Sequence, residues 1–72
     1  MRDRIKDLLK LLSNHINSLK KIPLHQGTCD VVEIIDFQDM AQQFNLNNEE
    51  YEQAIDYGQI LLERKIRQLY YG

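Results

Sequence analysis

The chain has 72 residues, a formal net charge of −2 and a hydrophobic fraction of 43%. This length allows one domain with a small core, and the hydrophobic fraction is that of a folded chain rather than a disordered one. The single cysteine excludes an intrachain disulfide, which favours a reducing environment. No apolar run approaches the roughly 20 residues of a membrane span, and the charged N-terminus is unlike a signal peptide. We therefore expect a soluble, cytoplasmic protein.

Residues 2–20 have the pattern of an amphipathic helix. Their apolar side chains recur at steps of three or four residues, which places them on one face: Ile5, Leu8, Leu9, Leu12, Ile16 and Leu19. Pro23 and Gly27 then interrupt the pattern, so residues 21–29 are predicted to be a loop.

Residues 30–44 allow two interpretations. Four β-branched residues within 31–35 favour a strand, but the chain offers no partner strand. Asp30 followed by Glu33 is a plausible start of a helix, and apolar residues continue at helical spacing. We expect a helix over residues 30–44. The alternative is a short extended piece, with the helix starting after Asp36.

Residues 48–70 are predicted to form a long helix. Asn47 and Glu50 stand at the two positions of a capping box, and Leu46 and Tyr51 stand at those of a hydrophobic staple. Gly58 lies in the apolar stripe and costs about 1 kcal/mol relative to alanine. We expect another helix backbone to approach it closely; the alternatives are a kink or the floor of a pocket.

These elements predict an all-α fold: a three-helix domain with two long antiparallel helices and a shorter helix that bridges them. A helix, a proline-containing loop, a middle helix, a corner near Ala41 and Leu46, and a long last helix resemble several small helical bacterial proteins, including the YlaN-type regulators. The resemblance is in the order of elements and includes no functional motif, so it implies no particular activity.

Residues 36–55 also resemble a helix-turn-helix, at Ala41, at the turn Asn45-Leu46 and at the apolar pair Ala54-Ile55. Any tight corner between two helices needs a small residue and a buried turn residue, so this pattern is generic. A DNA-binding regulator that uses residues 36–58 is the alternative function.

Charge argues against that alternative. Residues 26–62 contain eight acids and no Lys or Arg, whereas phosphate binding is supplied largely by these two cations. The acids at the start of the last helix would face the bases and phosphates: Glu49, Glu50, Glu52 and Asp56. We do not expect this chain to bind DNA.

Metal binding and catalysis have little support in the sequence. The candidate ligands are His15, His25, Cys29 and Asp30, and no second pair has the spacing of a zinc site. A nucleophilic Cys29 would need a nearby histidine as a base and a shielded pocket, which so short a chain cannot readily build. We expect no enzyme activity, no metal and no cofactor.

The tyrosines give the best indication of function, because tyrosine is favoured in protein interfaces. We predict a small non-enzymatic regulator that binds a protein through a helical face, as an inhibitor, adaptor or regulatory subunit. The acidic middle suits a basic partner, including a nucleic-acid-binding protein. A homodimer, or a purely self-assembling module, is also plausible. The predicted partner-binding residues are Glu49, Glu50, Glu52, Asp56, Tyr57, Tyr70 and Tyr71.

Overall fold

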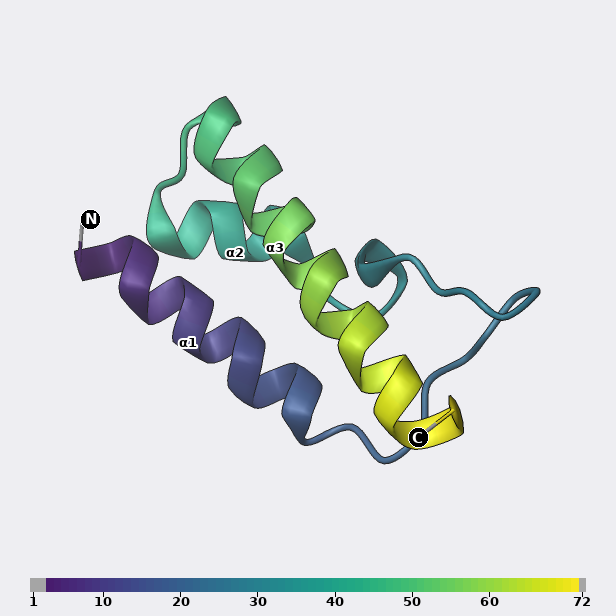
Figure 1. Cartoon of the computed structure of the whole chain (residues 1–72). Coiled ribbons are helices and arrows are strands. Elements are labelled where there is room, and N and C mark those ends of the chain that lie inside the picture. The colour runs from purple at the N-terminus through teal and green to yellow at the C-terminus, as the bar shows by residue number, and fades with distance from the viewer. Residues whose placement is uncertain (1–2, 72) are drawn as a thin grey trace.

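The computed structural model describes residues 3–71, with side chains described from residue 5 onward. It contains three α-helices, one 3-10 turn and one π-helical turn, which in chain order are α1 (Asp3–Asn17), η1 (Val31–Glu33), α2 (Phe37–Phe44), α3 (Asn48–Ile66) and η2 (Arg67–Tyr71) (Figure 1). Within these residues there is no strand, only an isolated bridge between His25 and Thr28. The prediction of an all-α fold is confirmed.

Helix α1 has the amphipathic character that its sequence predicts. Leu8, Leu12 and Ile16 are almost fully buried, while Leu11 on the flank of the stripe is 42% exposed. The helix ends at Asn17, three residues before the predicted end, and residue 2 lies outside the described part. The ammonium group of Lys65 donates a hydrogen bond of 3.0 Å to the carbonyl oxygen of Asn17. This contact satisfies one of the carbonyls that a helix end leaves without a partner.

The core lies between α1, α3 and the segment that joins them. Its buried side chains come from all these parts: Leu8, Leu12, Ile16, Ile22, Cys29, Val31, Ile35, Phe37, Ala54, Leu62 and Ile66. No helix among the described residues is long and apolar enough to cross a membrane.

The two long helices run in the same direction, so the predicted antiparallel arrangement is wrong. Figure 1 shows α1 and α3 descending side by side. Leu9 of α1 and Tyr57 of α3 line one groove at the N-terminal halves, and Lys65 reaches Asn17 at the C-terminal ends. Antiparallel neighbours are typical of short connections. Here residues 18–47 separate the helices, and α2 brings the chain back to the level at which α1 begins.

The predicted helix over residues 30–44 is also wrong in its first half. Asp30 makes no capping hydrogen bond through its side chain, and only the 3-10 turn Val31–Glu33 follows. The backbone N–H of Val31 donates instead to the side chain of Gln59, at 2.8 Å. The α-helix begins at Phe37, where the Asp36 carboxylate accepts from the backbone N–H of Asp39 at 3.1 Å. The alternative start after Asp36 is therefore the correct one.

The corner between α2 and α3 forms as the sequence predicts. Asn45 ends α2 in the left-handed conformation (φ 54°), which asparagine tolerates better than most residues. Asn47 and Glu50 form the full capping box at the start of α3. The α-helix ends at Ile66 rather than at residue 70, and the π-helical turn of η2 takes up the following residues.

Gly58 faces side chains, not the backbone of another helix as predicted. A Cβ atom at this position would lie 3.1 Å from the ring of Phe37 and 3.3 Å from a methyl group of Val31. Both neighbours are buried. The missing side chain therefore lets η1 and the start of α2 pack closely against the middle of α3.

Candidate protein-binding surface

The predicted partner-binding residues are spread along α3 and η2 and do not form one continuous surface. Asp56 and Tyr57 belong to the middle of α3, whereas Tyr70 and Tyr71 follow its end. At 1.5 Å per residue, about 20 Å of helix separates Tyr57 from Tyr70. The structure thus divides the set into an acidic part and a tyrosine-containing C-terminal part.

Glu50 was predicted to bind a partner, but it is buried and does not belong to the exposed surface of α3. Its side chain is only 7% exposed. One carboxylate oxygen accepts a hydrogen bond of 3.1 Å from the backbone N–H of Asn47, and the Glu50 N–H donates to the Asn47 side chain at 2.8 Å. The Glu50 side chain therefore stabilises the start of α3 through the capping box.

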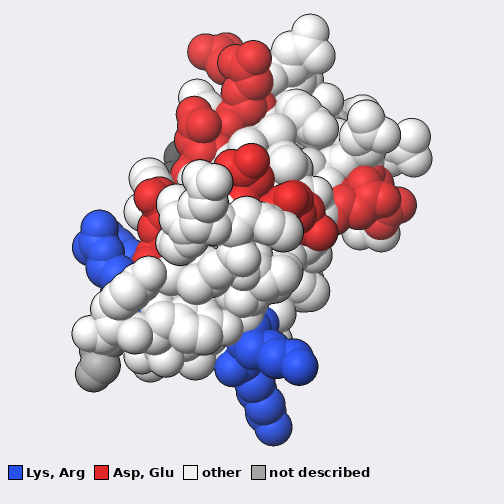
Figure 2. Space-filling view, turned by 90° about the vertical axis from the view of Figure 1, so that its right-hand side faces the viewer, with Lys and Arg blue, Asp and Glu red and all other residues white. Residues whose placement is uncertain are grey.

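Glu49, Glu52 and Asp56 are exposed and lie on one side of α3, at steps of three and four residues. Figure 2 shows carboxylates over the upper end and across the middle of one face, with Lys and Arg at its lower end and left edge. The upper end is where α3 begins. On this face, acidic groups therefore gather towards the start of α3 and basic groups lie at the opposite end.

Tyr57 is 37% exposed and, as the residue after Asp56, points about 100° around the helix from that acid. Its ring helps to line a groove of about 210 Å³ between the N-terminal halves of α1 and α3. Most lining groups are apolar, contributed by Ile5, Leu8, Leu9 and Ala54, with Gln53 and Glu50 at the α3 side. An apolar groove and a row of exposed carboxylates on different sides of one helix suit a partner that carries both apolar and cationic side chains and contacts both sides.

Tyr70 has a structural role that its sequence position did not reveal. Its hydroxyl accepts a hydrogen bond of 2.8 Å from the backbone N–H of Ile22 and donates one of 3.1 Å to the carbonyl oxygen of the same residue. Ile22 is buried. This tyrosine therefore fixes the loop after α1 to the C-terminal end of the chain, even though its side chain is 44% exposed.

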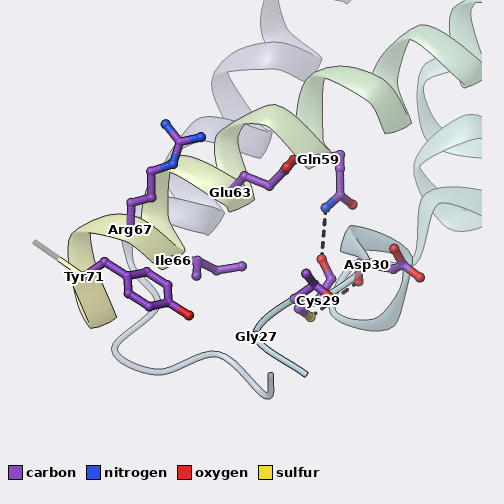
Figure 3. A pocket seen from close by; sticks show the side chains of 9 residues that line it. Gly27, Cys29, Asp30, Gln59, Glu63, Ile66, Arg67 and Tyr71 are labelled. Carbon is purple, nitrogen blue, oxygen red and sulfur yellow. Dashed lines mark hydrogen bonds between the residues drawn. The ribbon is translucent and has the colours of Figure 1, made fainter. Parts of the chain in front are cut away.

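Gln59 fixes the same loop at a second point, and the sequence analysis missed it. Its amide N–H donates to the carbonyl oxygen of Cys29 at 2.9 Å, while its amide oxygen accepts from Val31 N–H at 2.8 Å. Figure 3 shows this side chain reaching from α3 to the backbone beside Cys29. No motif signals such a residue, because a glutamine in a helix is usually a solvated surface group.

A second groove, of about 470 Å³, lies between this loop and the C-terminal part of α3. Gln59 and Cys29 line one side and Tyr71, which is 69% exposed, lines the other (Figure 3). Glu63 and Arg67 project from α3 and η2 at its border. The groove therefore combines two acids, Asp30 and Glu63, with one base and one aromatic ring.

The Cys29 thiol is not in the environment of a reactive cysteine. It is 3% exposed, and its sulfur lies 3.6 Å from a carboxylate oxygen of Glu33. Burial, followed by the hydrogen bond and negative charge of Glu33 and the charge of Asp30, raises the pKa of the thiol. A reactive cysteine needs the opposite shift. His15 and His25 are exposed, and no three metal-ligating side chains gather within the described residues.

Comparison with known proteins yields no family model, curated protein or solved structure that matches this chain.

Proposed function

We propose that this chain is a small non-enzymatic regulator that binds a protein partner through the exposed face of α3. The observation that carries this proposal is the row of exposed carboxylates on α3, together with the apolar groove that Tyr57 lines on another side of the same helix. Residues 26–62 contain no Lys or Arg to neutralise this row. The partner that fits is a basic protein with an apolar side chain to place beside Tyr57.

The helix-turn-helix corner supports a second candidate, a DNA-binding regulator. Helix α2, a three-residue connection and α3 have the arrangement that this motif requires. The exposed residues at the start of α3, however, include Glu49, Glu52 and Asp56, which would repel the phosphates on both sides of a groove. Charge therefore favours a basic protein over DNA, including a protein whose own nucleic-acid site is covered by this acidic face.

The proposal is tested by affinity capture from a lysate of the source organism, with and without nuclease, followed by mass spectrometry. Two baits are compared: the wild-type chain and the triple variant Glu49→Lys, Glu52→Lys, Asp56→Lys. We expect a stoichiometric protein that survives nuclease, is retained by the wild-type bait and is lost from the triple variant.

The matched control is Asp7→Lys, which reverses an exposed carboxylate on α1, away from the proposed surface. This bait should retain the partner. Equal recovery of all proteins by the wild-type and triple-variant baits would refute the acidic surface. Recovery of nucleic acid, or of proteins only in the absence of nuclease, would favour the DNA-binding alternative.

A further inference from the structure

The solvent-exposed side of α3 and η2 has a symmetric arrangement of charges. Gln53, Asp56, Ile60, Arg64 and Arg67 are all exposed, and steps of three, four, four and three residues place them on one side of the helix. Ile60 is at the centre of this series and is 52% exposed. We call these five residues the α3 stripe.

The spacing about Ile60 is the same in both directions along the helix. Asp56 lies four residues before it and Arg64 four residues after it, which is about 6 Å along the axis in each case. Gln53 and Arg67 lie seven residues away, or about 10 Å. A twofold axis that passes between Ile60 and the Ile60 of a second copy, perpendicular to both helices, therefore places each acidic or amide group of one stripe opposite an arginine of the other.

We propose that the α3 stripe binds the α3 stripe of a second copy of this chain, antiparallel about a twofold axis at Ile60, to form a homodimer. A twofold interface requires a patch that is complementary to itself, in which a first residue meets a second and the second meets the first. Asp56 and Arg64 satisfy this condition twice per dimer. A parallel pairing would instead bring like charges together.

The groups in the stripe are available for this contact. The side chains of Asp56, Arg64 and Arg67 form no hydrogen bond or ion pair with residues 5–71, the part whose side chains the structure describes. Ile60 would be covered by its own counterpart, which removes one of the largest exposed apolar groups from water. Tyr57 and Glu63, each three residues from Ile60, would face one another across the interface at the edge of the stripe.

The homodimer is inferred from the residues of the α3 stripe alone and does not depend on the proposed regulatory function. Asp56 belongs to both surfaces, however, so a basic partner and a second copy would exclude each other. Dimer formation would then cover the acidic surface until a partner that binds more tightly displaces the second copy.

The test is sedimentation velocity at low ionic strength, from micromolar to near-millimolar protein, on the wild type and on charge-reversed variants. We expect the wild type to approach twice its 8.6 kDa chain mass as concentration rises. Asp56→Arg and Arg64→Asp should each raise the dissociation constant by about tenfold or more, since each replaces two attractive pairs per dimer with two repulsive ones.

Two complementary measurements separate this interface from any general effect of charge. An equimolar mixture of the Asp56→Arg and Arg64→Asp variants should form heterodimers that neither variant forms with itself, because opposite charges then face each other at both sites. The double variant, which carries both changes, should recover the wild-type dissociation constant. Asp7→Arg is the control and should leave it unchanged.

All three substitutions are at exposed positions, and circular dichroism checks that helix content is retained. A wild-type chain that stays monomeric at every concentration would overturn the proposal. A dimer that both single reversals leave unchanged, or one that neither the mixture nor the double variant restores, would place the interface elsewhere and equally overturn it. The double variant Glu49→Lys, Glu52→Lys leaves all five stripe residues unchanged. Loss of partner capture by this variant, with an unchanged dimer dissociation constant, would bear on the proposed function alone.

Discussion

Replacement of Gln59 by methionine tests the contact that holds the loop against α3. Methionine keeps a similar length and helix propensity but cannot hydrogen-bond to the backbone of Cys29 and Val31. These two residues are 3% and 0% exposed, so water cannot readily replace the lost partner. A buried backbone group without a partner costs about 1–3 kcal/mol. Two such groups beside a half-buried side chain give an expected loss of about 2–4 kcal/mol.

The assay is urea denaturation followed by far-ultraviolet circular dichroism. With a slope of about 1 kcal/mol per molar urea for so small a domain, the midpoint should fall by about 2–4 M. This is a large part of the roughly 5 kcal/mol total stability of a small domain. Gln42→Met is the matched control, because Gln42 is exposed on α2 and its side chain forms no hydrogen bond among the described residues. A loss of less than about 0.5 kcal/mol, equal to that of the control, would refute the assigned role.

Three further perturbations test separate contacts. Tyr70→Phe removes both hydrogen bonds to Ile22 and should lower the unfolding free energy by about 1–2 kcal/mol in the same assay. Asn47→Ala removes half of the capping box with Glu50 and should cost about 1 kcal/mol, with fraying of α3 visible in amide hydrogen exchange. Because the pKa of the Cys29 thiol is higher in the folded protein than in the unfolded chain, folding favours the protonated thiol. Its contribution should be complete below the ordinary thiol pKa of 9.0 and decline as the pH rises above it. Denaturation of the wild type and Cys29→Ala across this range measures the difference; a constant difference would contradict the shift.

The two long helices were predictable because local signals agree there. The apolar stripe of α1 and the capping box of α3 depend on residues within a few positions of one another. The segment that contains Val31 was mispredicted because its conformation depends on Gln59, which lies 28 positions away and pairs with its backbone. Helical spacing of the apolar residues in that segment fits a helix equally well, so periodicity alone could not distinguish the two conformations.

The relative direction of α1 and α3 is also a tertiary property. Apolar stripes specify which faces pack but not the direction in which the helices run. A connection of about thirty residues permits either direction, and the packing of Phe37 and Val31 against Gly58 selects one by returning the chain to the start of α1. A prediction from helix number and amphipathicity therefore had no basis for choosing the parallel arrangement.

The sequence predicts the negative charge of the candidate surface, but not which residues belong to that surface. The concentration of acids between residues 26 and 62 is visible in the sequence. Exposure decides which of them can contact a partner: Glu50 is buried at the helix start, whereas Glu49, Glu52 and Asp56 are exposed. Tyr70 contributes its hydroxyl to the loop instead, which a terminal tyrosine in a sequence does not reveal.

Carboxyl-group footprinting shows whether the acidic surface of α3 is covered by a bound partner. The free protein and its captured complex are labelled with a carbodiimide and a small amine, and modification of each acid is measured by mass spectrometry. We expect labelling of Glu49, Glu52 and Asp56 to fall in the complex while that of Asp7 on α1 is unchanged. Unchanged labelling of the three α3 carboxylates in a stoichiometric complex would contradict this expectation.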